Sequence, residues 1–149
     1  MHPRSWIGVC ALVFAAAPVF AQQPAAAGRI KVLSGSVVIV RAGVPVAAQL
    51  GHVVLEADAL RTGADGRVGI TLLDDTRVSL GPDSEVRLDR FAFAPADGRI
   101  GLVLNFVHGV AAYVSGRIAK LAPDAVRLET PSAIVGVRGT TLGIRVPER

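Results

Sequence analysis

Between Arg67 and Arg90 the chain alternates apolar and polar residues in three short runs that are separated by turn-forming residues. Residues two apart in a β-strand lie on the same face of a sheet, so this alternation is typical of strands buried on one face. The residues expected to face the core are Val68, Ile70, Leu72, Val78, Leu80, Val86 and Leu88. Those expected to face solvent are Arg67, Thr71, Arg77, Ser79, Glu85, Arg87 and Asp89. The stretch predicts a meander of three strands.

The rest of the chain after residue 28 continues in the same manner. Further strand candidates cover residues 29–35, 36–43, 53–55, 99–106, 110–116, 125–131, 133–139 and 141–146. The apolar run Val37 to Val40 indicates a strand covered on both faces, and Gly109 separates two of the candidates. The turns are too short for crossovers, so antiparallel neighbours are expected. We predict an all-β fold of about ten short, mainly antiparallel strands in a twisted sandwich, roll or short solenoid.

The first 21 residues have the pattern of a secretory signal peptide, the only helix that we expect. Arg4 supplies the positive charge, Ile7 to Ala17 form the apolar segment, and Val19-Phe20-Ala21 place small residues before a cleavage site between Ala21 and Gln22. The apolar run is shorter than a membrane span requires. Cys10, the single cysteine, lies inside this segment, so the mature chain has no disulfide and no cysteine ligand for a metal.

The remaining length accommodates one domain. We expect residues 22–28, rich in alanine and glutamine, to be a flexible linker, residues 29–146 to be the all-β domain and residues 147–149 to be a tail. The formal net charge of +4 for the whole chain is too small an excess to indicate an anionic partner. Export would place the protein in the periplasm.

Several ordered motifs resemble the FecR domain. They are Leu60-Arg61-Thr62-Gly63, Leu73-Asp74-Asp75-Thr76-Arg77-Val78-Ser79-Leu80-Gly81, Ser84-Glu85-Val86-Arg87-Leu88, Thr130-Pro131 and Val135-Gly136-Val137-Arg138-Gly139-Thr140. The similarity extends from about Arg29 to Val146. We interpret the motif residues as structural.

The resemblance implies an exported all-β domain which, in iron-uptake regulators, senses an outer-membrane receptor and controls a sigma factor. Those regulators also carry a cytoplasmic anti-sigma segment and a transmembrane helix, and we expect a stand-alone exported form here. The sequence departs from the family pattern at two turns. Asp74-Asp75 replaces an Asp-Gly pair, and Ala57-Asp58 replaces a Gly-Asp pair, so glycine's backbone freedom is lost at both.

The residues offer little for catalysis or metal binding. We interpret His52 and His108 as partly exposed turn residues that have few chemical partners. The carboxylates of Asp74, Asp75, Asp83 and Glu85 could gather around calcium, but their spacing fits no established calcium loop and favours solvated turns. No nucleophile or phosphate-loop pattern is present, and no cofactor is expected. The glycines at 136, 139 and 143 indicate close backbone packing or bulges in strands.

The outward arginines could form a stripe for an anionic partner, but acidic residues lie among them, which favours a mixed face with ion pairs across strands. They are Arg67, Arg77, Arg87 and Arg90. Phe91 and Phe93 are expected to anchor the core or its rim. The scarcity of aromatic residues, together with export, argues against nucleic-acid binding.

These observations predict a non-catalytic periplasmic module for binding or sensing, which contacts a protein or a cell-envelope component. Exposed edge strands are its most plausible contact surface. One alternative is an assembly module that self-associates through those edges. A less favoured one is a cell-wall glycan hydrolase that uses a carboxylate pair such as Asp74 and Glu85.

Overall fold

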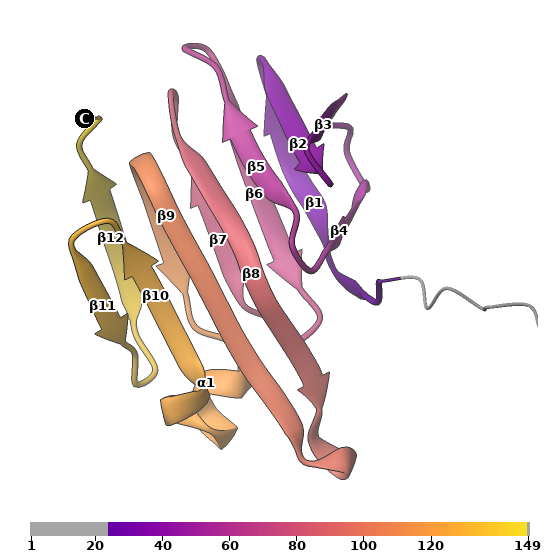
Figure 1. Ribbon diagram of the computed structural model, residues 1–149, viewed down its shortest axis with the longest axis vertical. Coiled ribbons are helices and arrows are strands. Elements are labelled where there is room, and N and C mark those ends of the chain that lie inside the picture. The colour runs from indigo at the N-terminus through magenta and orange to yellow at the C-terminus, as the bar shows by residue number, and fades with distance from the viewer. Residues whose placement is uncertain (1–23, 149) are drawn as a thin grey trace, which may run out of the picture.

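One long strand is shared by two β-sheets in the computed structural model, which describes residues 24–148 (Figure 1). The first part of β9 (Arg99–Val114) pairs with β8 and β10, and its last six residues pair with β7 and β12. Between these parts Gly109 has a φ of 94°. The strand changes sheet at this glycine.

Both sheets are built almost entirely from short strands. In spatial order, sheet A contains β4 (Val53–Leu55), β1 (Ala26–Ser34), β6 (Arg67–Leu72), β7 (Arg77–Leu80), the end of β9 and β12 (Thr141–Val146). Sheet B contains β3 (Val44–Ala47), β2 (Val37–Arg41), β5 (Ala59–Thr62), β8 (Glu85–Ala94), the start of β9, β10 (Val126–Thr130) and β11 (Ala133–Gly136). The predicted all-β class is confirmed.

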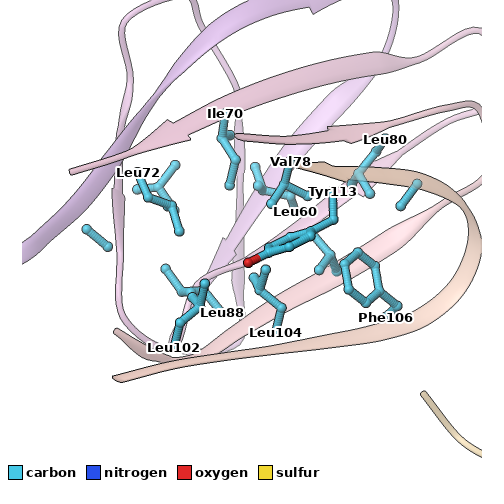
Figure 2. Close-up of a cluster of buried hydrophobic side chains, with 14 of the residues drawn as sticks. Leu60, Ile70, Leu72, Val78, Leu80, Leu88, Leu102, Leu104, Phe106 and Tyr113 are labelled. Carbon is cyan, nitrogen blue, oxygen red and sulfur yellow. The ribbon is translucent and has the colours of Figure 1, made fainter. Parts of the chain in front are cut away.

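The core lies between the inner faces of these sheets (Figure 2). Each residue of the central stretch that was expected to face the core is at most 4% exposed. They are Val68, Ile70, Leu72, Val78, Leu80, Val86 and Leu88. Tyr113 and Phe106 from β9 are the largest fully buried side chains. The period of two therefore identified the buried faces correctly.

The predicted meander is correct for two of its three strands. β6 and β7 form an antiparallel hairpin, but β8 pairs with β5 and β9 in the other sheet. The turn after Leu80 therefore carries the chain from one sheet to the other. Ser34 and Gly35 do the same between β1 and β2, which are not paired with each other. Alternation reports which face is buried, but it carries no information about which strand lies alongside.

The expected, mainly antiparallel arrangement is confirmed, but the division of residues 99–116 into two strands is wrong. The candidates 99–106 and 110–116 are one bent strand, because a glycine with positive φ can bend a strand without ending it. β10 lies parallel to β9 although every other pair is antiparallel in the part of the chain that the structure describes. Residues 115–125 supply the crossover that a parallel neighbour requires.

That crossover contains a helix that the sequence did not predict. α1 (Arg117–Leu121) is a single helical turn followed by the 3₁₀ turn η2 (Pro123–Ala125), and a second 3₁₀ turn, η1 (Pro95–Asp97), joins β8 to β9. The expectation that a signal peptide would be the only helix is therefore wrong. A five-residue helix is too short to show a period of 3.6.

The boundaries differ slightly from the predicted ones. β1 begins at Ala26, so the end of the expected linker is a strand in which Ala27 is buried. In β2, Val38 and Val40 are only half-buried, so that strand is not covered on both faces. The predicted signal peptide and its cleavage site lie outside the described residues. Within residues 24–148, no helix has the length and apolar character needed to cross a membrane.

Candidate functional site: sheet edges and motif residues

The Arg-Thr-Gly motif joins three parts of the molecule through buried hydroxyl groups. The Thr62 hydroxyl donates to the carbonyl oxygen of Gly81 at 2.7 Å and accepts a hydrogen bond from the Ser84 N–H at 2.9 Å. The Ser84 hydroxyl in turn accepts from the Val110 N–H at 2.8 Å. These bonds tie β5, the turn between β7 and β8, and the bend of β9 together. A buried hydroxyl or backbone group without a hydrogen-bond partner would destabilise the fold, and here each group has one. The cluster is therefore structural.

Asp74 holds the crossover helix against the β6–β7 turn. Its carboxylate accepts hydrogen bonds from the Thr76 hydroxyl at 2.7 Å and from the Ile118 N–H at 3.2 Å, and it is fully buried. Its carbonyl oxygen accepts from the Arg117 N–H at 2.7 Å. A Cβ at Gly116 would clash with Thr76 and Asp74. Gly116 is therefore an essential packing position, which sequence inspection missed because no regular pattern surrounds it.

The two departures from the family pattern both occur where the backbone has positive φ. Ala57 has a φ of 70° and Asp75 a φ of 69°. The expected loss of glycine's freedom is therefore real at both turns. The Asp75 carboxylate also forms an exposed ion pair with Arg117 at 3.0 Å.

Asp58, beside Ala57, is a buried carboxylate that serves the edge of sheet A. It accepts two hydrogen bonds from Arg41, at 2.9 and 2.7 Å, and one from the Leu55 N–H at 2.8 Å. Arg41 also donates to the Val53 carbonyl at 3.0 Å. The hydrogen bond to Asp58 raises the pKa of Arg41. Backbone groups of edge strand β4 are thereby occupied.

The C-terminal motif behaves differently from the others. Val137 is buried, and the Thr140 N–H donates to the Ser115 hydroxyl at 2.6 Å, so part of it anchors the segment. At the other end, the Thr130 hydroxyl accepts a hydrogen bond from the Ala133 N–H within the β10–β11 hairpin at 3.1 Å. However, an added Cβ would have no neighbour within 4 Å at the motif glycines Gly136 and Gly139, or at Gly143 in β12. Of the two roles expected for these glycines, close packing or bulges, close packing inside the chain is therefore wrong.

The structure separates the carboxylates considered for catalysis or calcium. Asp74 lies in the turn before β7, whereas Asp83 and Glu85 lie at and after the turn that follows β7. Glu85 accepts from Arg61 at 2.9 Å and lies 3.7 Å from His108. Among residues 24–148, no group of three or more histidine, cysteine or acidic residues is arranged to hold a metal ion. The pair proposed for glycan hydrolysis is thus not assembled.

The two histidines lie where they serve the fold. His108 is inside β9, not in a turn as expected, and its Nδ1 lies 3.0 Å from the Asp83 carbonyl oxygen. His52 precedes β4 and its backbone bonds to Gln49 and Ile30.

The outward arginines do not form one stripe, because they belong to different sheets. Arg67 and Arg77 lie on strands of sheet A, and Arg87 and Arg90 lie on β8 of sheet B. The two outer faces point in opposite directions. Arg87 donates to Asp89 at 3.2 Å within β8, whereas Arg61 of β5 and Glu85 of β8 form an ion pair across strands at 2.9 Å, as expected of a mixed face.

Phe91 and Phe93 are the anchors that the sequence indicated. Phe91 is buried in the core, and Phe93 packs against its rim. The Arg117 guanidinium lies 4.7 Å from the centre of the Phe93 ring. This contact fastens the crossover helix to the β8–β9 hairpin.

Each sheet has two edges, and the edges differ in how they are protected. β4 is three residues long and its backbone is bonded by Arg41 and Asp58. β3 contains Pro45, and β12 contains Arg145. β11 reads Ala-Ile-Val-Gly, has no proline or charge, and is exposed at every position. Proline and charge are devices that blunt sheet edges, so among the edge strands of the described residues β11 is the one that lacks them and has no side chain bonded to its edge.

A hollow of about 500 Å³ is lined by Ile134 and Gly136 of this edge strand, by Val137 and Arg138 after it, by Val126 and Arg127 of β10, and by Pro123 and Asp124 of η2. Ile134 is 69% exposed and Val135 is 41% exposed. These residues are the surface feature that the sequence analysis did not place. The signal was present as a neutral apolar strand without a charged residue, but only the sheet order shows it to be an edge.

Comparison with sequence models of protein families matches residues 58–149 to the family described as FecR protein. The chain belongs to the FecR family. The matched part begins at Asp58, so it contains β5 to β12 and excludes β1 to β4. No curated protein and no solved structure matches this FecR chain. FecR domains are regulatory and sensory, so the family supports a role in regulation without naming a partner.

Proposed function

We propose that this FecR-family chain is an exported, non-catalytic binding or sensory module of the periplasm, which contacts a protein of the cell envelope through the free edge of β11. The observation that carries the proposal is the difference between this edge and the other three. An unpaired strand offers N–H and C=O groups to a partner's strand, and its alternate side chains add contact area.

The use of the motif carboxylates supports a non-catalytic role. Asp58 and Asp74 are both nearly inaccessible and saturated with hydrogen bonds to the backbone or to neighbouring side chains. A general acid or base needs access to a substrate. These residues build turns that hold strands in place, and this leaves the sheet edge as the functional surface.

Capture from a cell-envelope extract tests the proposal. The mature chain should retain a specific envelope protein, and the purified form of that protein should bind directly. Ile134→Glu should abolish retention, because a charge on this edge opposes strand addition. Val46→Glu is the matched control, since Val46 is 44% exposed on the other edge of the same sheet. Equal capture by Ile134→Glu and wild type would place the contact elsewhere, and no capture by wild type would remove the support for binding.

A further inference from the structure

The backbone groups that β11 turns outward follow from its hairpin. Thr130 and Ala133 close a two-residue turn, so they form a hydrogen-bonded pair. Pairs in an antiparallel ladder alternate between bonded and non-bonded. The Leu128–Val135 pair is then bonded, whereas Ile134 and Gly136 direct their N–H and C=O groups away from β10. The free edge therefore offers the backbone N–H and C=O groups of Ile134 and Gly136.

The side chains at those two positions have opposite shapes on the same face of the sheet. Ile134 projects outward from β11 and is 69% exposed, while Gly136 lies under the hollow of about 500 Å³. An added Cβ at Gly136 would touch nothing within 4 Å of its own chain, and the residue does not have positive φ. Neither backbone conformation nor internal packing thus requires a glycine here. The edge therefore carries a bulky side chain at Ile134 and, two residues further on, an open space over Gly136.

We propose that a second copy of this chain pairs with β11 in antiparallel orientation, about a two-fold axis through Val135. Antiparallel strands related by such an axis place residue 135 opposite itself and residue 134 opposite residue 136. Each Ile134 then enters the hollow over Gly136 of the second copy. The outward groups of both residues meet their counterparts, and sheet B continues from one copy into the next. Figure 1 shows β11 at the margin of the molecule.

The charges on the neighbouring strand fit the same register. In β10, Glu129 lies beside Ile134 and Arg127 lies beside Gly136. Each row of the continuous sheet would therefore run from Glu129 of one copy to Arg127 of the other, with Ile134 and Gly136 between them. These opposite charges lie three strand spacings apart, roughly 14 Å, so they add only a weak attraction between the two copies.

This inference rests on the proposed use of the β11 edge and names the second copy as its occupant. The second copy and the envelope protein would compete for this one edge, and the two claims can fail separately. A chain that dimerises but captures no envelope protein keeps the dimer and loses the proposed function. A chain that captures a partner but stays monomeric keeps the function and loses the dimer.

Sedimentation of the full chain over a range of concentrations tests the dimer. Wild type should show a monomer–dimer equilibrium. Ile134→Gly and Gly136→Ile should each raise the dissociation constant roughly tenfold or more, because each removes or blocks both isoleucine contacts of the symmetric dimer. The double variant Ile134→Gly/Gly136→Ile exchanges the bulky side chain and the open position, and it should restore dimerisation. Val46→Glu should leave the equilibrium unchanged.

Disulfide trapping tests the register. In a Cys10→Ser background, Val135→Cys should form a crosslinked dimer on oxidation, because directly opposed non-bonded residues have Cα atoms about 4.5 Å apart, within disulfide range. Ile134→Cys should crosslink much less, since its opposite residue is Gly136. A monomer at every concentration, or failure of the double variant to recover, would overturn the proposal. Efficient trapping through Ile134→Cys instead of Val135→Cys would overturn the register.

Discussion

Single residues of this FecR chain show where local strain is tolerated. Ala42, Ala57, Asp75 and Asp83 have positive φ although none is glycine. Ala57 and Asp75 are each next to residues that make strong hydrogen bonds: Asp58 with Arg41 at one turn, and Asp74 with Thr76 at the other. The left-handed conformation costs an L-residue about 1–2 kcal/mol, so the surrounding hydrogen bonds must compensate for it.

Replacing Ala57 by glycine should therefore stabilise the protein. Relief of the strain exceeds the extra entropy of glycine in the unfolded chain, which leaves a gain of about 0.5–1 kcal/mol in the free energy of unfolding. Urea denaturation measures it. Ala92→Gly, in the middle of β8, is the matched control and should instead lose about 0.5–1 kcal/mol. Equal effects of the two changes would contradict the strain at Ala57.

The Tyr113 hydroxyl is a buried polar group without a hydrogen-bond partner in the described chain. Burial, and then the charge of Asp74, raise the pKa of Tyr113 to about 12 from 10.0. The Thr76 hydroxyl opposes this shift, but its proton is donated to Asp74 at 2.7 Å. The neutral form is therefore favoured in the folded state.

The raised pKa of Tyr113 makes the stability of the protein fall at alkaline pH. Below pH 10 the Tyr113 hydroxyl keeps its proton in both the folded and the unfolded state, so its contribution to the free energy of unfolding is complete. Between pH 10 and 12 the hydroxyl loses its proton in the unfolded state first, so the free energy of unfolding falls as pH rises. Wild type should lose about 2 kcal/mol more than Tyr113→Phe between pH 9 and 12, by urea denaturation. At pH 7, Tyr113→Phe should be equal in stability or up to about 1 kcal/mol more stable, because it removes an unsatisfied hydroxyl. Parallel pH profiles for the two proteins would contradict this assignment.

Among the elements, β9 decides the architecture. It lies in both sheets, and it changes sheet at Gly109, where a Cβ would clash with Ser84 and with the Asp83 carbonyl. The turn before Ser84 makes the corresponding crossing between β7 and β8. The Thr62, Ser84 and Val110 hydrogen bonds join both crossings, so the motif residues preserve the geometry of one junction.

Gly109→Ala should destabilise the protein by about 2–4 kcal/mol, because it adds backbone strain to a clash with buried groups. Gly143→Ala should be neutral or stabilising by up to about 1 kcal/mol, since that strand position is open. Thermal unfolding followed by circular dichroism compares them. A small effect of Gly109→Ala would mean that β9 can bend elsewhere.

At the scale of the whole molecule, the shared strand should make the two sheets unfold together. A single core lies between them, and residues of both contribute to it (Figure 2). Neither sheet can keep its inner face buried without the other.

Val78→Ala in sheet A and Val86→Ala in sheet B should each lower the denaturation midpoint without dividing the transition. Each should cost about 1–3 kcal/mol, as expected for a truncated buried side chain. Far-UV circular dichroism should report the same midpoint as the fluorescence of Tyr113, the one tyrosine of the chain. Two separated transitions in either variant would show that the sheets are independent.

Much of the fold could be read from the sequence because it depends on local periodicity. The alternation at Val68, Ile70 and Leu72 identified a buried face, and the motif around Arg61, Thr62 and Gly63 indicated the family. The turn at Ala57 was likewise recognised as unusual for a residue with a Cβ. Each of these inferences requires only neighbours in the chain.

The tertiary structure alone decided which strands are neighbours. The transfer of β8 to the second sheet, the parallel β9–β10 pair and the open edge at β11 depend on contacts between residues far apart in sequence. The same holds for Asp74, which looked like a turn carboxylate and proved to hold a helix 44 positions away. Side-chain alternation specifies burial, while strand order is set by packing of the whole core, which no local pattern encodes.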